Sequence, residues 1–279
     1  MRPRPPVWWV GGKRGILRQL GPLFPKAPWD LYIEPFLGGG AVFFHLVSSL
    51  FFHRGPTQAV LIDKNGELIN FYRVVRDNLE ELLADLRKHE DTFEYFRRIL
   101  ALKPEQLTPV ERASRFLYLN KTCYRAILRE IGQGQLKVWY GWEANRWRVD
   151  EANLRLVSRI LARPGIQLLH GDYSLALNYA RPGTFVFLDP PYQPRSNTDR
   201  DTYYTRDRFD ERQQIRLGKV FRELDKRGCL VMLCNSDTLF IRNLYAGYDI
   251  RRVYAVHCIS DRRDGRRPKP ELVIRNYRN

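Results

Sequence analysis

Five short apolar runs, each followed by a turn signal and then by a helical pattern, constrain the fold of this 279-residue chain more than any other feature. Repeated strand-turn-helix units form open, mostly parallel sheets, because two parallel strands must be joined by a long crossover that is usually a helix. The sequence therefore predicts an α/β fold. The expected strands are residues 31–36, 59–62, 166–170, 184–188 and 229–234, with a terminal antiparallel pair at 253–259 and 271–275 at a sheet edge.

Residues 75–148 interrupt this alternation. Their first part has helical periodicity at 79–102 and 109–120, and the remainder combines Gly132–Gln135 with tryptophans and arginines. Aromatic and arginine side chains can stack on bases and bind phosphates, although tryptophans in a small helical unit also serve as its core. We therefore expect an inserted helical unit at 75–148 within an α/β domain that comprises 1–74 and 149–279.

A formal net charge of +16 indicates a polyanionic partner, and this charge is segmental. The excess of basic side chains lies in 1–29, 112–148 and 251–279, so it can form a stripe along one face. Arginine outnumbers lysine by 37 to 10, and guanidinium groups bind phosphate in bidentate fashion, although a codon bias would produce the same ratio. We expect a nucleic-acid partner, with a solvated basic surface as the alternative.

Several classes of protein do not fit this sequence. The longest apolar stretch, 41–52, is interrupted by polar residues and is shorter than the roughly 20 residues of a membrane span. The first residues lack the apolar core and cleavage site of a signal peptide. Cys123, Cys229, Cys234 and Cys258 show no Cys-x-x-Cys spacing, and no clustered His and Cys ligand set is present. We expect a cytoplasmic protein with reduced cysteines and without a membrane span or a metal.

The tetrapeptide Asp189-Pro190-Pro191-Tyr192 follows an apolar run, where open α/β sheets bind their ligands. The lone pair of an exocyclic amine on a nucleobase is delocalised into the ring, so methyl transfer to it needs acceptors for its two N–H bonds. The Asp189 carboxylate and the Pro190 carbonyl can accept them, and Pro191 keeps the preceding residue extended. Tyr192 offers a ring face to an extruded base. These four residues are the expected catalytic residues, and a strand-terminating turn with a buried Asp is the alternative.

A second group, Glu34 to Gly40, ends the first strand with glycines that let the backbone approach a cofactor closely. A dinucleotide fingerprint would need glycine where Phe43 stands, so NAD and FAD are disfavoured. Asp63, at the end of the second strand, is spaced to accept hydrogen bonds from ribose hydroxyls, and Asp172 can accept one from an adenine amino group. Glu34, Asp63, Asp172 and Asp189 thus stand at successive strand ends.

With these motifs in place, the sequence resembles the Dam family of adenine-specific DNA methyltransferases, which use S-adenosylmethionine. The similar segments keep the family's order and cover nearly the whole chain. They are Trp9-Val10-Gly11-Gly12-Lys13, Glu34 to Gly40, Asp63-Lys64-Asn65, a target-recognition hairpin from Leu119-Asn120-Lys121 to Gly141, Asp189 to Tyr192, Asn235-Ser236, and Glu271-Leu272 to Tyr277.

The resemblance implies a Rossmann-like, mostly parallel sheet of a class I S-adenosylmethionine methyltransferase with an inserted target-recognition domain. It implies a monomer that flips an adenine out of double-stranded DNA and methylates its exocyclic amino nitrogen (N6) without a metal. Lys13 would pair with the cofactor's carboxylate. The residues expected to bind S-adenosylmethionine are Trp9, Lys13, Glu34, Phe36, Gly38, Gly40, Asp63, Asp172 and Asp189, and those expected to contact DNA are Arg125, Arg129, Lys137 and Trp139.

Three positions depart from the family pattern. Arg125-Ala126 replaces the usual Asn-Gly, Trp139 replaces a proline, and Trp8 replaces a lysine. Because these positions would meet base edges and phosphates, the family's GATC target is not carried over to this chain.

Other functions fit parts of the sequence. They are an amino-methyltransferase for cytosine in DNA or adenine in RNA, a DNA-binding relative without turnover, and a structural protein with a basic surface. The last explains the charge but none of the strand-end acids. The loop 193–209 is expected to be either a lid that substrate orders or a solvated loop.

Overall fold

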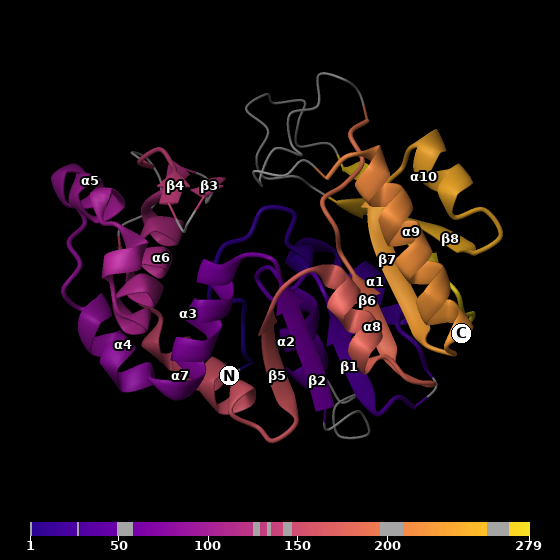
Figure 1. The fold of residues 1–279 in the computed structure, drawn as a ribbon, viewed down its shortest axis with the longest axis horizontal. Coiled ribbons are helices and arrows are strands. Elements are labelled where there is room, and N and C mark those ends of the chain that lie inside the picture. Colours follow the sequence, from indigo (N-terminus) through magenta and orange to yellow (C-terminus); the bar gives the residue numbers. More distant parts are fainter. Residues whose placement is uncertain are drawn as a thin grey trace.

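A seven-stranded sheet forms the centre of the molecule in the computed structural model (Figure 1). The structure describes residues 2–26, 28–48, 58–124, 129–132, 135–141, 147–195, 209–255 and 268–279, with the backbone alone at 129–132 and 135. The strands of the sheet are β1 (Leu31–Glu34), β2 (Gln58–Asp63), β5 (Ile166–His170), β6 (Phe185–Leu188), β7 (Leu230–Ser236), β8 (Asp249–Ala255) and β9 (Lys269–Arg275), and a separate hairpin pairs β3 (Arg129–Gly132) with β4 (Gln135–Lys137).

The strand order is β5-β2-β1-β6-β7-β9-β8. Neighbours among the first five strands in this order pair in parallel, whereas β9 runs antiparallel to both β7 and β8. The last strand in the sequence thus lies between β7 and β8. The predicted α/β fold, with its mostly parallel sheet and its antiparallel pair at one edge, is confirmed.

Helices flank the sheet and extend beyond β5 at one end (Figure 1). No helix of the described ranges is long and apolar enough to cross a membrane. The α-helices are α1 (Leu17–Leu20), α2 (Ala41–Ser48), α3 (Gly66–Asp77), α4 (Leu79–Leu86), α5 (Phe93–Ala101), α6 (Pro109–Thr122), α7 (Glu151–Leu161), α8 (Ala176–Tyr179), α9 (Glu211–Lys226) and α10 (Leu239–Leu244), and the 3-10 helices include η1 (Lys13–Ile16), η2 (Gly21–Leu23), η4 (Pro104–Gln106) and η6 (Tyr173–Leu175).

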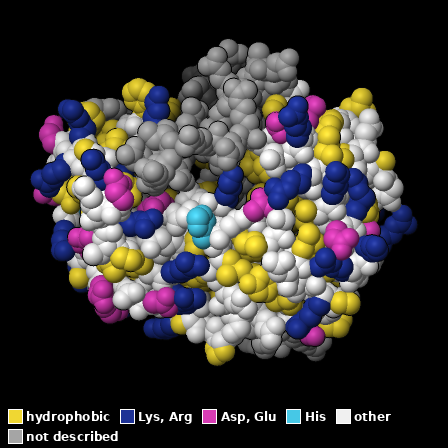
Figure 2. Space-filling view, in the orientation of Figure 1, with side chains coloured by type: hydrophobic (Ala, Val, Ile, Leu, Met, Phe, Trp, Pro, Cys, Tyr) yellow, Lys and Arg dark blue, Asp and Glu magenta, His cyan; other side chains and the backbone are white. Residues whose placement is uncertain are grey.

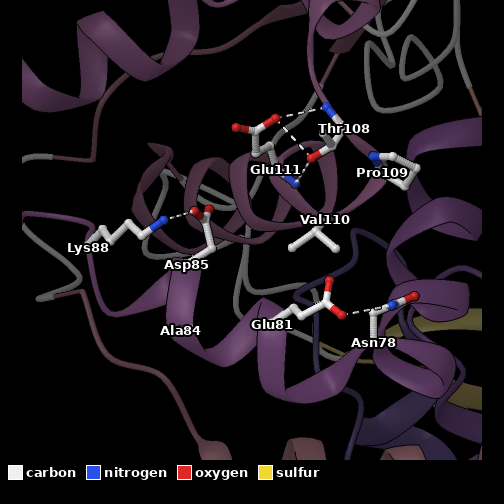
Figure 3. Close-up of a pocket in the computed structure, with 9 residues that line it drawn as sticks. All are labelled: Asn78, Glu81, Ala84, Asp85, Lys88, Thr108, Pro109, Val110 and Glu111. Atoms are coloured by element: carbon white, nitrogen blue, oxygen red, sulfur yellow. Dashed lines mark hydrogen bonds and ion pairs between the residues drawn. The ribbon is translucent and has the colours of Figure 1, made fainter.

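Local sequence explains where α6 begins. Thr108 and Glu111 cap it reciprocally, since each side chain accepts a hydrogen bond from the other residue's backbone N–H (Figure 3). Pro109 occupies the first position of the helix, where the missing N–H costs nothing. This start was predicted at the same residue.

Successive apolar side chains of the central strands point to opposite faces of the sheet. Because both faces then carry apolar side chains, each face packs into a hydrophobic core. In β1 the Tyr32 side chain packs into one core and the Ile33 side chain into the other. In β6, Phe185 and Phe187 join the core of Tyr32, and Val186 joins the core of Ile33. Two apolar layers therefore fix the sheet and hold its strand ends in register.

The segment 75–148 packs in two parts. Leu82, Leu83 and Phe116, from α4 and α6, belong to the core on one face of the sheet. Farther out, a separate small core is formed by Tyr95, Phe96, Ile99, Tyr118, Leu119, Cys123, Leu136 and Val138. The base of this segment is therefore continuous with the α/β layer, while its outer end has a core of its own.

Three side-chain amides attach the N-terminal segment to distant elements, because each amide bonds both the N–H and the C=O of one distant residue. Asn153 of α7 bonds both the N–H and the C=O of Arg4, at 2.9 and 3.0 Å. Asn120 of α6 bonds the N–H and the C=O of Trp8, at 2.8 and 2.7 Å. Gln19 bonds the N–H and the C=O of Tyr254 of β8, with both distances 2.9 Å. The first residues of the chain thus connect α6 and α7 to the opposite edge of the sheet.

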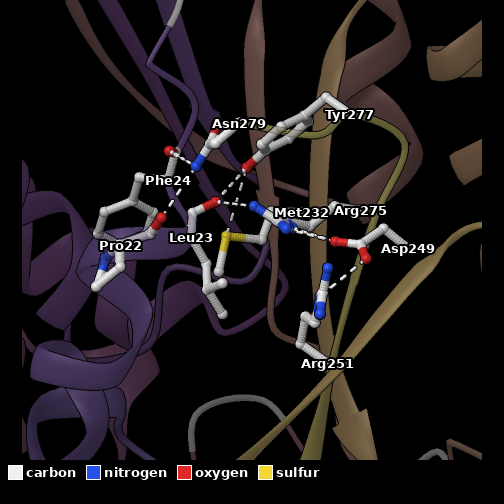
Figure 4. Close-up of polar contacts among 9 residues, drawn as sticks. All are labelled: Pro22, Leu23, Phe24, Met232, Asp249, Arg251, Arg275, Tyr277 and Asn279. Carbon is white, nitrogen blue, oxygen red and sulfur yellow. Dashed lines mark hydrogen bonds and ion pairs between the residues drawn. The ribbon is translucent and has the colours of Figure 1, made fainter.

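The C-terminal residues complete this connection (Figure 4). Arg275 pairs with Asp249 of β8 and donates to the Leu23 carbonyl at 2.9 Å. The Tyr277 hydroxyl donates to the same carbonyl at 3.1 Å, and Asn279 donates to the carbonyls on either side of it. Residues 22–24 and the C-terminal residues 275–279 therefore pack together.

Candidate active site at the carboxyl ends of the strands

The predicted acids lie along one edge of the sheet. Glu34 ends β1 and Asp189 follows β6, and these two strands are neighbours where the strand order changes direction. Asp63 ends β2, and Asp172 lies two residues beyond β5. Ligands of open α/β sheets bind at this edge beside such a switch point. The expected alignment of the four strand ends is therefore present.

Asp189, whose side chain is 19% exposed, forms an ion pair with the buried Lys13 of η1. The Lys13 Nζ lies 2.9 Å from a carboxylate oxygen of Asp189 and donates to the Gly11 carbonyl at 2.6 Å, and only 5% of the Lys13 side chain is exposed. Burial acts to lower the pKa of Lys13, but the charges of Asp189 and Glu271 outweigh it and raise that pKa. Burial raises the pKa of Asp189 to about 6 against the opposing effect of Lys13. At neutral pH both groups are charged. The predicted contact of Lys13 with the cofactor stays a prediction.

Tyr192 is held on two sides. Its hydroxyl donates a hydrogen bond of 2.9 Å to the Glu271 carboxylate of β9, and the Lys13 ammonium lies 4.8 Å from its ring centroid. Glu271 is 3% exposed. Glu271 was not predicted as a site residue, because an acid within a strand does not reveal which side chain it faces.

The backbone that follows the tetrapeptide is anchored by polar side chains from two other elements. Gln214 of α9 donates to the Pro191 carbonyl at 2.9 Å. Asn235 and Ser236 of β7 bond the N–H and the C=O of Gln193, at 3.0 and 2.6 Å. Because Pro191 precedes Tyr192 and Gln193 follows it, these contacts fix the backbone on both sides of Tyr192. The predicted lid that begins at 193 lies mostly outside the described residues.

The glycine loop after β1 lies against Trp9 and Asp63. Gly38 and Gly40 have positive φ values of 48° and 69°. A Cβ on Gly38 would come within 2.6 Å of the Trp9 indole, so only glycine fits there. The Asp63 carboxylate accepts hydrogen bonds of 2.8 Å from the N–H groups of Gly38 and Asn65. The three predicted cofactor segments therefore meet at the end of β2.

Glu34 and Phe36 have different surroundings. Glu34 is buried and accepts a hydrogen bond of 2.8 Å from Tyr32, and burial raises its pKa well above the usual range against the effect of that hydrogen bond. Phe36 is partly buried and stacks on Tyr173, with ring centroids 5.2 Å apart. Their contacts with a cofactor stay predictions.

Asp172 has protein partners that the sequence analysis did not anticipate. Arg216 of α9 donates to both of its oxygens, at 3.0 and 2.7 Å, and Ser174 Oγ donates at 2.6 Å. Burial alone would raise the pKa of Asp172, but these donors outweigh it and lower the pKa. A carboxylate has further lone pairs, so its predicted contact with an adenine amino group stays a prediction.

The predicted DNA contacts lie at the outer end of the segment 75–148. Lys137 ends β4 and is exposed, and the Trp139 side chain is 75% exposed. For Arg129 only the backbone in β3 is described, and Arg125 lies outside the described residues. Trp147 instead packs against His89 and Tyr118, so one tryptophan joins a core while another faces solvent. On the face in Figure 2, basic and acidic side chains are interspersed.

A hollow between α4 and the start of α6 contains none of the predicted site residues (Figure 3). Among its charged groups, Asp85 forms an ion pair with Lys88, and Glu81 accepts a hydrogen bond from the Asn78 amide. Within the described ranges, no group of three His, Cys, Asp or Glu side chains is arranged to hold a metal.

Comparisons with known proteins agree with this geometry. Residues 9–259 match the model of a family described as D12 class N6 adenine-specific DNA methyltransferase. The type II methyltransferase M1.LlaDCHI of Lactococcus lactis is 34% identical, covering 99% of this chain and 96% of that protein. The type II methyltransferase M.MjaIII of Methanocaldococcus jannaschii is 35% identical, covering 99% of this chain and all of that protein.

A DNA adenine methylase of Escherichia coli is 26% identical over 95% of this chain and 92% of its own length. These matches confirm the predicted resemblance and the predicted adenine methylation of DNA, and a methyltransferase of this kind takes its methyl group from S-adenosylmethionine. The chain belongs to the D12 class family of N6 adenine-specific DNA methyltransferases.

Proposed function

We propose that Asp189 and Pro190 activate the amino group of an adenine that is flipped out of duplex DNA, and that Tyr192 stacks on this base. The observation that carries the proposal is the ion pair of Asp189 with the buried Lys13, 2.9 Å apart at the switch point of the sheet. An ionised carboxylate is a strong hydrogen-bond acceptor, and its partner holds it in one place.

The two acceptors act on the two N–H bonds of the adenine amino group. The Asp189 carboxylate accepts one and the Pro190 carbonyl accepts the other, which localises the nitrogen lone pair on the side of the methyl donor. The acceptors keep their positions because Gln214 and Asn235 anchor the backbone that follows them. Groups fixed before the reaction need no reorganisation in the transition state.

The charges at this edge fit a cationic methyl donor. S-Adenosylmethionine supplies an electrophilic methyl group on a positively charged sulfur. The carboxylates of Asp189, Glu271 and Asp63 outnumber the single ammonium of Lys13, so the local field favours a cation. In this proposal Asp63 accepts hydrogen bonds from the ribose, and the remaining contacts come from Trp9, Lys13, Glu34, Phe36, Gly38, Gly40, Asp172 and Asp189.

The segment 75–148 is proposed as the target-recognition unit, and the enzyme is proposed to be site-specific and monomeric. Lys137 and the exposed indole of Trp139 support this role, since one can contact phosphate and the other can stack on a base. Since its substrate is DNA, the enzyme would act in the compartment that holds DNA.

Transfer of labelled methyl from S-adenosylmethionine to unmethylated genomic DNA tests this mechanism, with Asp189→Ala and Tyr192→Ala as variants. Nucleoside mass spectrometry identifies the product, and base-resolution mapping gives the recognition sequence. We expect N6-methyladenine with the wild type and its loss with Asp189→Ala.

Calorimetric binding of S-adenosylmethionine is the control, because a variant that still binds the donor has kept its fold at this edge. Full activity in a folded Asp189→Ala variant would overturn the proposed role of Asp189. Methylation at unrelated sequences would overturn site specificity.

A further inference from the structure

Glu271 is a buried acid whose hydrogen bond the mechanism above does not use. It lies on β9 opposite Ser236 of β7 and Val253 of β8, between two strands, and is 3% exposed. Burying a carboxylate is unfavourable unless partners compensate, so the burial of Glu271 calls for an explanation. Its hydrogen bond to Tyr192 connects it to the proposed catalytic tetrapeptide.

A stacking ring must be held at a defined angle. Tyr192 follows the end of β6, and two rotatable side-chain bonds set the direction of its ring. The backbone contacts of Pro191 and Gln193 fix its Cα, but they do not fix the ring itself. Tyr192 packs against the core on one face of the sheet, and the hydrogen bond to Glu271 and the Lys13 ammonium near the ring centroid add polar restraints on the ring.

We propose that Glu271 is a positioning residue for methyl transfer, which holds the ring of Tyr192 in the plane where the flipped adenine stacks. This inference rests on the stacking role of Tyr192 proposed above. Glu271 does not touch the base in this account. It acts through the tyrosine hydroxyl, 2.9 Å away.

Glu271 has a second effect, through its charge. The titratable groups that interact electrostatically with Asp189 are Lys13, Glu271, Glu34, Cys234, Tyr32 and Tyr192. Glu271 raises the pKa of both Asp189 and Lys13. Removing this negative charge therefore lowers the pKa of Asp189. The acid limb, which is the fall of the rate at acid pH where Asp189 becomes protonated, then begins at a lower pH. A loss of packing alone would not shift this pH.

Matched variants separate the hydrogen bond from the charge. Tyr192→Phe keeps the ring and removes the donor, Glu271→Gln keeps an acceptor and removes the charge, and Glu271→Leu removes both. Asp249→Asn, which alters another acid of the sheet that pairs with Arg275, is the control. Each variant is assayed for kcat and KM, for S-adenosylmethionine binding, and for thermal unfolding.

We expect Tyr192→Phe and Glu271→Leu to lower kcat about tenfold each, because each loses a hydrogen bond to a charged group. The double variant should lose about as much as either single variant, since both remove the same contact. Glu271→Gln should lose less and should move the acid limb to lower pH. Asp249→Asn should leave kcat unchanged.

A readout without chemistry uses 2-aminopurine in place of the target adenine in a duplex with the mapped recognition sequence. Stacking on the tyrosine ring quenches the flipped fluorophore, so Tyr192→Phe and Glu271→Leu should show longer fluorescence lifetimes than wild type. Wild-type lifetimes together with wild-type kcat in both variants would overturn the inference.

Tyr192→Ala separates the stacking role of Tyr192 from the positioning role of Glu271. If kcat falls in Tyr192→Ala but not in Tyr192→Phe or Glu271→Leu, the ring is needed and its positioning by Glu271 is refuted. If Tyr192→Ala retains wild-type kcat, the stacking role itself fails, and this inference fails with it.

Discussion

The carboxyl edge of the sheet and the outer end of the segment 75–148 hold their charged and aromatic side chains in opposite ways. At the edge, Lys13, Glu271 and Tyr192 are paired with one another or with Asp189, and Lys13 and Glu271 are almost fully buried. At the outer end, Lys137 is exposed and three quarters of the Trp139 surface meets solvent. One region is organised before substrate arrives, and the other presents its groups outward.

This difference follows from what each task requires. Chemistry is accelerated by groups that are already fixed where charge develops. Recognition of DNA needs side chains that reach phosphates and bases, so they must be accessible. Substitutions at the edge should therefore change kcat and stability together, whereas those at the outer end should change DNA binding alone.

The largest effect is expected for Asp189→Ala. Loss of the carboxylate removes one acceptor for the amino group, and kcat should fall by about 10² to 10³ fold. Asp189→Asn is the matched variant, since its amide oxygen can still accept one hydrogen bond, and it should retain more activity. Single-turnover methylation measures both, and a higher rate for Asp189→Ala than for Asp189→Asn would contradict this view of the edge.

Lys13→Met should come next, because it leaves the mostly buried Asp189 carboxylate without its cation. At pH 8 the free energy of unfolding should fall by about 3 kcal/mol. A carboxyl with a raised pKa contributes stability below its ordinary pKa and loses it as pH rises through the raised value. The deficit should therefore shrink toward pH 5. Denaturant unfolding at both pH values measures it, and an equal deficit at both would refute the ion-pair account.

The wild-type rate should itself show the titration of Asp189. With a pKa of about 6, this carboxylate is protonated as pH falls below that value and loses an acceptor site. The rate should then drop about tenfold per pH unit, and Lys13→Met should move the limb to higher pH. Single-turnover rates from pH 5 to 8 measure it. A flat profile would show that Asp189 does not need its charge.

Trp139→Ala tests the outer end of the segment 75–148. Loss of one stacked base should raise KM for DNA about tenfold, whereas kcat and thermal stability should stay at wild-type values because the side chain is exposed. Trp147→Ala is the contrast, since this ring packs against Tyr118 and its loss should lower stability. A fall in kcat for Trp139→Ala without a change in KM would break the division between the regions.

The smallest effect is expected for Lys137→Ala. A phosphate contact contributes uniformly across DNA sequences, so the salt dependence of binding should weaken by about one unit of slope. Titrations with a specific and an unrelated duplex at several salt concentrations measure it. A loss confined to the specific duplex would instead mark Lys137 as a base contact.

Sequence predicted the edge well because parallel strands end at a common border, so an acid after each strand must lie near the others. It did not predict that Lys13 pairs with Asp189, or that Glu271 faces Tyr192, because these partners come from distant parts of the chain. Arg216 shows the same limit for Asp172, since its position on α9 does not reveal its partner. Composition likewise did not distinguish the exposed Trp139 from the packed Trp147, since both lie in one basic and aromatic segment.

The position of β9 between β7 and β8 sets an order of assembly during synthesis. A ribosome completes β8 before β9, yet among the strands that the structure describes β8 pairs with β9 alone. A nascent chain that has not reached residue 269 therefore cannot add β8 to the sheet, and it has no Glu271 to receive the Tyr192 hydroxyl. Of the described strands, the one made last joins β8 to the sheet and completes the surroundings of the proposed catalytic tyrosine.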